Sequence, residues 1–225
     1  MDNNSEYYLI LADMKGSSSL SADQAGAAMS QLLPQLERQN QRLRADLIYP
    51  LEVNYGDEFG GLFSSPRAFY QIVSDVRDAL RGTAEFRFVT AHGRIGYAGG
   101  SLREMGGPVF ETASRALTRL KKKKQFSDWQ ISDPATNQAL TAMTNAAGAL
   151  IDQMTPYQHI VYMFDKAGLK GTEIAEKLSK DPRSISNAKK TGHCSTVIQI
   201  EQAMTAMLAN LAPGTEHASA REFQS

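Results

Sequence analysis

The sequence has 225 residues and a mass of 24.7 kDa, which allows one large domain or a larger domain with a small module. Its 42% hydrophobic content is enough for a buried core, and its 24 basic residues balance 24 acidic ones. The chain as a whole is therefore not a polycation that coats nucleic acid or membrane, although local basic patches remain open. The single cysteine, Cys194, excludes an intramolecular disulfide and a cysteine-rich zinc site, so a metal site is expected to use carboxylates.

The N-terminal residues are polar and acidic and lack the basic start of a signal peptide. No apolar run approaches the ~20 residues that a membrane-spanning helix needs. We expect a soluble, cytoplasmic protein with no membrane partner.

The first predicted element is a strand at Tyr7–Ala12, a continuous apolar run that suits burial on both faces. Asp13 ends this run, and a Gly/Ser loop follows. Ser21 or Asp23 could cap the next helix, whose apolar positions recur at helical spacing as far as Leu43.

Further strands are expected where short apolar runs are bounded by turn residues: Leu47–Val53, Phe59–Phe63, Glu85–Ala91, Arg94–Ala98 and Trp129–Ile131. Helices are expected at residues 65–80 and 109–124. The order β-α-β-β-α-β, followed by a helix and a last strand, predicts an α+β fold of the ferredoxin-like type with additions.

The helical pattern becomes continuous after Thr155-Pro156, which indicates a domain boundary. We expect a ferredoxin-like domain at residues 1–132, a connecting helix at 133–154, a small all-α domain at 155–212 and a flexible tail at 213–225.

Two acidic residues stand where acids are costly. Asp13 ends a buried strand, and Asp57 lies at the tip of a hairpin that neighbours this strand in the predicted sheet. Two convergent carboxylates repel one another unless a cation neutralises them, and oxygen ligands suit Mg²⁺ or Mn²⁺. Glu58 could be a third carboxylate, although alternation from Asp57 points it to the other face. The alternative is that Asp13 caps the loop and Asp57-Glu58 is an ordinary turn.

At these residues the sequence resembles the class III nucleotidyl cyclases. LADMKGSSSL resembles their first-strand motif, and NYGDEFGGLF resembles their second metal-binding hairpin and is close to the signature of the GGDEF diguanylate cyclases. RIGYAGG and VFETASRAL resemble a later cyclase strand and helix. The overall pattern is similar to the SatD family, over residues 7–132.

The resemblance implies a palm-type domain that binds a nucleoside triphosphate and two Mg²⁺ or Mn²⁺ ions. In such a domain the 3′-hydroxyl attacks the α-phosphate and pyrophosphate leaves. It implies catalytic roles for Asp13, Asp57 and Arg115, and metal contacts from Asp13, Met14 and Asp57. It also implies a homodimer with active sites between the subunits. The residues that match the nucleotide-binding segments are Lys15, Gly16, Ser17, Ser18 and Gly56.

The chain departs from the cyclase pattern at the residues that read the substrate. Val53 stands where cyclases carry a purine-reading lysine, and Glu111 or Thr112 stands where they carry a ribose-orienting asparagine. These departures leave two possibilities open, altered chemistry or a nucleotide-binding domain without turnover.

A basic stretch closes the predicted helix at 109–124. Arg115, Arg119 and Lys121–Lys124 occur without an intervening acid. Because cations are favoured at a helix C-terminus, a solvated helix end is the preferred interpretation, and a phosphate or nucleic-acid contact is the alternative.

The C-terminal part resembles the helix-turn-helix of sigma-factor region 4 and LuxR proteins over residues 155–210. The resemblance predicts that Ile185 and Ala188 face the core. The residues suited to contact double-stranded DNA are Arg183, Ser184, Ser186, Asn187, Lys189 and Lys190. The alternative is a helical module that pairs protomers or binds protein.

Three functions follow. The first is a metal-dependent, cyclase-like enzyme coupled to a DNA-binding module. The second is a transcriptional regulator whose degenerate cyclase domain senses a nucleotide and which binds DNA through its helix-turn-helix. The third is an adaptor with neither activity.

Overall fold

The computed structural model describes residues 5–123 and 125–211. It divides into two compact units, one of Met1–Thr141 with Thr205–Ser225 and the other of Ala142–Met204. The expected tail at 213–225 lies outside the described residues. Within the described ranges no helix is both long enough and apolar enough to span a membrane.

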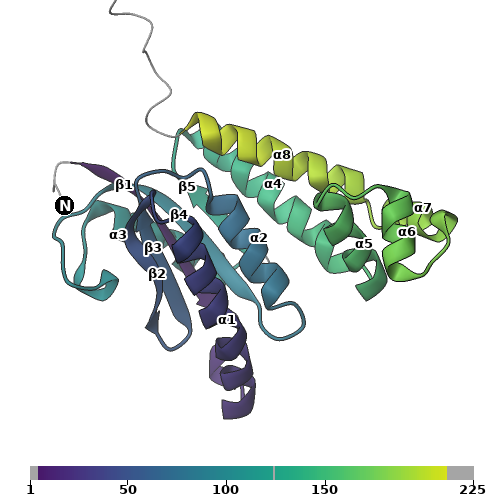
Figure 1. Ribbon diagram of the computed structural model, residues 1–225. Coiled ribbons are helices and arrows are strands. Elements are labelled where there is room, and N and C mark those ends of the chain that lie inside the picture. Colours follow the sequence, from purple (N-terminus) through teal and green to yellow (C-terminus); the bar gives the residue numbers. More distant parts are fainter. Residues whose placement is uncertain (1–4, 124, 212–225) are drawn as a thin grey trace, which may run out of the picture. The chain divides into compact units, whose positions relative to one another are not determined.

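The first unit is built on a five-stranded sheet in the order β2-β3-β1-β4-β5 (Figure 1). Its strands are β1 (Glu6–Met14), β2 (Leu47–Tyr55), β3 (Glu58–Phe63), β4 (Phe86–Arg94) and β5 (Ser127–Gln130). Neighbouring strands are antiparallel except β4 and β5, which are parallel. The first four strands have the ferredoxin-like order, and β5 extends that sheet beside β4. The prediction of a ferredoxin-like α+β sheet is therefore confirmed.

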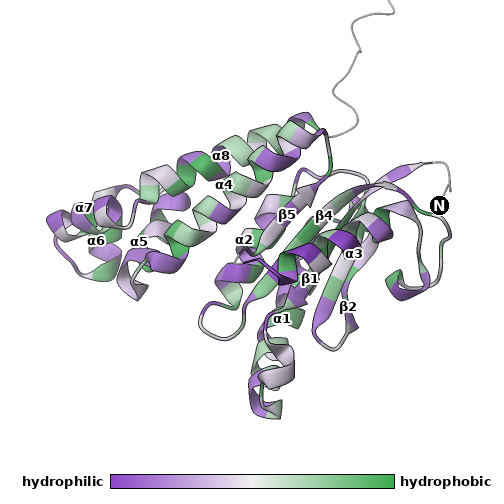
Figure 2. Cartoon of the chain, turned by 180° about the vertical axis from the view of Figure 1, so that it is seen from behind, coloured by the Kyte–Doolittle hydropathy of each residue, from purple (hydrophilic) through white to green (hydrophobic). Residues whose placement is uncertain are grey.

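Helices cover both faces of this sheet. Figure 1 shows α1 (Ala22–Arg42) and α2 (Phe69–Ala79) in front of it, and Figure 2, from behind, shows α3 (Pro108–Lys121) on the opposite face. Ser21, one of the two residues expected to cap this helix, is the N-cap of α1 and forms a capping box with Gln24.

Each face of the sheet has its own apolar layer. Leu9 and Leu11 of β1 lie in the cluster that packs against α3, whose buried stripe includes Ala113 and Leu117. On the other face, aromatic rings dominate. Phe59 lies 5.4 Å from Phe86 between ring centroids, and Phe63 lies 5.1 Å from Phe69. Alternation along β1 therefore assigns Asp13 to the α3 face.

The strand expected at Arg94–Ala98 is wrong. β4 ends at Arg94, and the chain beyond it makes only an isolated bridge between Tyr97 and Gly106. The backbones of Gly96 and Gly107 come so close that a Cβ on Gly107 would lie 2.1 Å from the Gly96 nitrogen. The RIGYAGG segment is thus a loop whose glycines permit backbone contact.

The second unit is helical. The helices α5 (Pro156–Lys166), α6 (Gly171–Leu178) and α7 (Pro182–Thr191) share a core of Val161, Ile174, Ala175, Ile185 and Ala188. The helices α4 (Pro134–Gln153) and α8 (Cys194–Asn210) contain the boundaries between the units. The inward positions of Ile185 and Ala188 are confirmed.

Candidate functional site

Asp13 lies in the middle of a row of charged side chains on the α3 face of the sheet. Only 6% of Asp13 is exposed, although it is an acid. In the strand register it stands opposite Glu58 of β3 on one side and Arg87 of β4 on the other. The three residues and Lys121, which belongs to the last turn of α3, are called the charged row below.

Both oxygens of the Asp13 carboxylate contact cations. Arg87 donates from Nη1 to Oδ2 at 3.2 Å, and the Lys121 Nζ lies 2.7 Å from Oδ1. The two cations differ in exposure, because the side chain of Arg87 is 19% exposed and that of Lys121 is 49% exposed. Asp13 is thus a buried acid with a cation at each of its carboxylate oxygens.

Glu58 is the second carboxylate of the charged row. Burial is the largest influence on its pKa and raises it. The charges of Asp13 and Asp57 also raise this pKa, while the charge of Lys121 lowers it. Glu58 pairs directly with Asp13 in the strand register, whereas Asp57 belongs to the turn and lines the pocket described below.

Asp57 joins the hairpin turn to the Gly/Ser loop after β1. Ser17 donates its hydroxyl hydrogen bond to the Asp57 carboxylate, and the Met14 amide donates to the Asp57 carbonyl at 3.0 Å. The loop begins at Gly16, whose φ of 68° is a conformation that glycine adopts without strain, and continues as a short 3-10 turn at Ser17–Ser19. Two segments far apart in sequence are therefore held together by their polar groups.

A pocket of about 470 Å³ opens at this junction. Its polar side is formed by Ser17, Ser18, Gly56 and Asp57, and its apolar side by Met14, Leu20, Ala25, Gly26 and Met29. Asp13 is not among its lining residues. The structure therefore brings Asp57, Gly56, Ser17 and Ser18 to one pocket and leaves Asp13 in the charged row on the α3 face.

The backbone of the loop offers free donors to this region. The Lys15 amide donates to the Glu85 carbonyl at 2.8 Å, and the Lys15 ammonium pairs with the Glu85 carboxylate at 2.8 Å. Within the described part of the chain, the amides of Gly16, Ser17 and Ser18 donate to no protein acceptor. Consecutive free amides are the groups that bind phosphate oxygens in anion-binding loops.

Arg115 lies in a different hollow of the first unit. That hollow, of about 570 Å³, is lined by Tyr97, Gly106, Gly107, Phe110, Glu111, Ser114 and Arg115. The Arg115 Nη1 lies 3.8 Å from Glu111, and its Nη2 donates to Thr112 Oγ1 at 3.3 Å. Arg115 is therefore apart from both Asp13 and Asp57 within one chain.

Sequence reasoning missed the two cations of the charged row. The signal for Arg87 is a charge between two buried aromatic residues, Phe86 and Phe88, in a strand. The signal for Lys121 is helical spacing, because it follows the buried residues Ala113 and Leu117 of α3 at intervals of four. Lys121 is exposed, like Lys122 and Lys123, as expected for a solvated helix end, but its ammonium also reaches Asp13.

No ready metal cluster accompanies these residues. Among residues 5–123 and 125–211, no group of three or more His, Cys, Asp or Glu side chains is arranged to hold a metal ion. Of the expected metal ligands, Met14 and Asp57 meet through a backbone hydrogen bond, whereas the Asp13 side chain lies in the charged row. The metal site itself stays a prediction.

The second unit presents a partly basic helix. Arg183, Ser186, Asn187 and Lys190 of α7 are exposed. Lys189 is held by Asp165, with its Nζ 2.6 Å from Oδ1. Ser184 is used by the helix start, because its amide and hydroxyl both donate to Asp181. Four of the six expected DNA-contacting residues are therefore exposed: Arg183, Ser186, Asn187 and Lys190.

Searches with the sequence find neither a matching family model nor a matching curated protein. Similar solved structures include the guanylate cyclase domain of RhGC from Catenaria anguillulae in complex with GTP, at 18% identity, 50% coverage of this chain, 72% of that chain and a TM-score of 0.39. The non-canonical dimeric guanylyl cyclase domain of the RhoGC fusion protein from Blastocladiella emersonii is 16% identical. The match covers 50% of this chain and 73% of that chain, with a TM-score of 0.40.

A regulator of polyketide synthase expression from Bifidobacterium adolescentis covers 90% of this chain and 85% of its own, at 14% identity and a TM-score of 0.22. Similarities of this strength carry no information on substrate or site residues.

Proposed function

We propose that the first unit is a cyclase-like domain that binds a nucleoside triphosphate and converts it to a cyclic or oligomeric nucleotide. The observation that carries this proposal is the pocket shared by the two segments that resemble cyclase motifs, joined where Ser17 donates to Asp57. The ferredoxin-like strand order supports it, because that order places the loop after β1 next to the β2–β3 turn.

Asp13 and Asp57, with the Met14 carbonyl, would hold Mg²⁺ or Mn²⁺. Carboxylate and carbonyl oxygens suit these hard cations. The position accepts positive charge, since the Lys121 ammonium already lies 2.7 Å from Asp13. A bound ion would supply charge compensation for the phosphates.

The chain's own residues have separate tasks in this proposal. The free amides of Gly16, Ser17 and Ser18 bind phosphate oxygens, and the apolar side of the pocket excludes water. Because Arg115 lies in another hollow, we infer a homodimer in which Arg115 of one subunit serves the pocket of the other. There its guanidinium would stabilise charge on the phosphates.

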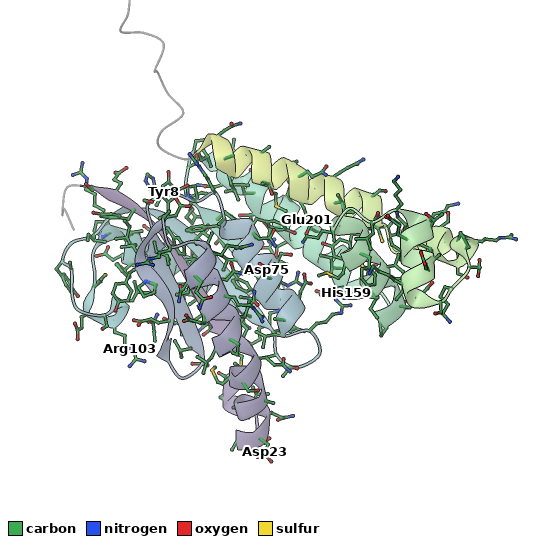
Figure 3. All side chains as sticks on the ribbon, viewed as in Figure 1. Tyr8, Asp23, Asp75, Arg103, His159 and Glu201 are labelled. Atoms are coloured by element: carbon green, nitrogen blue, oxygen red, sulfur yellow. The ribbon has the colours of Figure 1, made fainter. Side chains whose placement is uncertain are left out.

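The test is product analysis. The purified protein is incubated with the four ribonucleoside triphosphates and Mg²⁺ or Mn²⁺, and products are identified by mass spectrometry. The enzyme should lose its product in Asp57→Asn and keep it in Asp23→Asn, a matched change at an exposed acid in the first turn of α1 (Figure 3). Equal products from both variants would refute the assignment of Asp57.

A second candidate is a nucleotide-sensing transcriptional regulator without turnover. Glu111 beside Arg115 favours it, because an acid at 3.8 Å offsets the charge that phosphate transfer requires. Val53 likewise lacks the polar group with which a cyclase reads a purine. In this case nucleotide binds, and no product forms in any variant.

DNA binding by the second unit is part of both proposals. Three residues, 179–181, separate α6 from α7, and Ser179 has a left-handed φ of 51°. A sharp turn between two short helices with a polar second helix is typical of a helix-turn-helix. The exposed Arg183, Ser186, Asn187 and Lys190 would make the contacts.

The matching test uses three lysines. Lys190→Ala should weaken DNA binding and lower the salt dependence by about one phosphate contact. Lys189→Ala should have a smaller direct effect because Asp165 holds that side chain. Lys177→Ala, at an exposed position on α6, is the control. If all three variants bind equally, α7 does not read DNA, and a protein-binding module becomes the better interpretation.

A further inference from the structure

The charged row places two carboxylates side by side in a sheet. Asp13 and Glu58 are directly opposite in the β1–β3 register. Residues so placed have Cβ atoms about 5 Å apart, and like charges at this position repel. The protein supplies two cations to Asp13, Arg87 from β4 and Lys121 from α3.

The two protein cations are not equivalent. Arg87 comes from the adjacent strand, its side chain is 19% exposed, and its guanidinium is fixed against Asp13 Oδ2. Lys121 comes from the last turn of a helix, and its side chain is 49% exposed. Lysine carries a compact charge on a flexible stem, so it leaves a carboxylate more readily than a buried arginine does. Asp13 Oδ1 is thus the exchangeable oxygen of the charged row.

We propose that Asp13 and Glu58 form a divalent-cation site and that the Lys121 ammonium occupies it as a displaceable internal cation. The inference rests on the proposed function, whose metal it assigns to Glu58 as well as Asp13. Mg²⁺ or Mn²⁺ and Lys121 compete for the same carboxylate oxygen, so Lys121 sets the metal concentration at which the domain becomes loaded. No covalent step is involved.

Metal binding to the full chain without nucleotide tests this directly. Free Mn²⁺ is measured by electron paramagnetic resonance during titration of wild type, Lys121→Met and Lys122→Met. A half-exposed ion pair is weak, so removing Lys121 should tighten Mn²⁺ binding about five-fold. Lys122→Met removes the same charge from an exposed neighbouring position and should change the affinity much less.

Double variants assign the ligands. In the Lys121→Met background, Asp13→Asn and Glu58→Gln should each abolish the gain, while Asp23→Asn should preserve it. Folding of every variant is checked by the fluorescence of Trp129, the one tryptophan, which is fully buried. Equal affinities of wild type and Lys121→Met, or a gain that survives Glu58→Gln, would overturn the proposal.

The result separates this inference from the proposed function. If nucleotide is bound or converted but Lys121→Met leaves Mn²⁺ affinity unchanged, the function stands and the competition does not. If Lys121→Met gains affinity while no variant binds or converts nucleotide, the cation site stands and the cyclase-like function does not.

Discussion

Arg87→Met tests how much more Arg87 than Lys121 contributes to the free energy of unfolding. The change keeps the apolar stem and removes the guanidinium from Asp13, whose side chain is 8% exposed. Breaking a buried pair costs about 3–5 kcal/mol because a charge is left without its partner. Lys121 remains at Asp13 Oδ1, so we expect the lower end, about 3 kcal/mol. Lys121→Met should cost at most about 1 kcal/mol, since that lysine is half exposed.

Urea unfolding followed by Trp129 fluorescence measures this difference in the first unit. With a slope of about 2 kcal/mol per molar urea, the midpoint should fall by about 1.5 M for Arg87→Met and by no more than about 0.5 M for Lys121→Met. Lys122→Met should leave the midpoint unchanged. If Arg87→Met and Lys121→Met have equal midpoints, Arg87 is not the fixed partner, and the distinction between a fixed and a displaceable cation fails.

Three other predictions concern positions outside the charged row. Burial lowers the pKa of His92, which stacks on Tyr8 at 4.2 Å, so the unfolded chain binds a proton there that the folded chain resists. The free energy of unfolding should therefore fall as the pH drops below about 6.5, and His92→Gln should reduce this slope in urea titrations at pH 7.5 and 5.5; an unchanged slope would contradict it. Gly60→Ala should strongly lower the urea midpoint of unfolding followed by Trp129 fluorescence, because a Cβ there would lie 2.6 Å from Leu11 Cδ2 and 2.9 Å from a backbone oxygen. A midpoint equal to that of the wild type would show that the strand relaxes without loss of stability. Thr155→Ala should cost about 1 kcal/mol by removing the cap of α5, seen as faster hydrogen exchange of the α5 amides, whereas equal exchange would show that tertiary packing alone holds the helix start.

Local patterns predicted the elements of the first unit well, because its segments obey simple periodicity. The apolar run at Tyr7–Ala12 is the central strand β1, and Ser21 starts α1 through its own side chain. The short segment Trp129–Ile131 contributes to the edge strand β5, as expected. Only Arg94–Ala98 was wrongly assigned among the strands, because its glycines serve backbone contact with a distant loop, which spacing along the chain does not reveal.

The site was less predictable because it depends on register and on helix ends. The sequence marks Asp13 and Asp57 as unusual acids, but it does not show that Glu58 pairs with Asp13, since that depends on how β3 aligns with β1. Lys121 is one of four successive lysines, and only the rotation of α3 about its axis selects it for Asp13.

The β2–β3 turn connects the two parts of the candidate site. Asp57 lines the pocket with Ser17, and the next residue, Glu58, stands in the charged row opposite Asp13. Consecutive residues thereby face the loop with the free amides on one side and the Asp13–Lys121 ion pair on the other. A nucleoside triphosphate that binds the loop amides brings negative charge beside this turn, which favours a divalent cation at Asp13 and Glu58 over the single charge of Lys121. Nucleotide and metal should therefore each strengthen the binding of the other, and Lys121→Met should reduce that mutual effect because the metal no longer has to displace an ammonium.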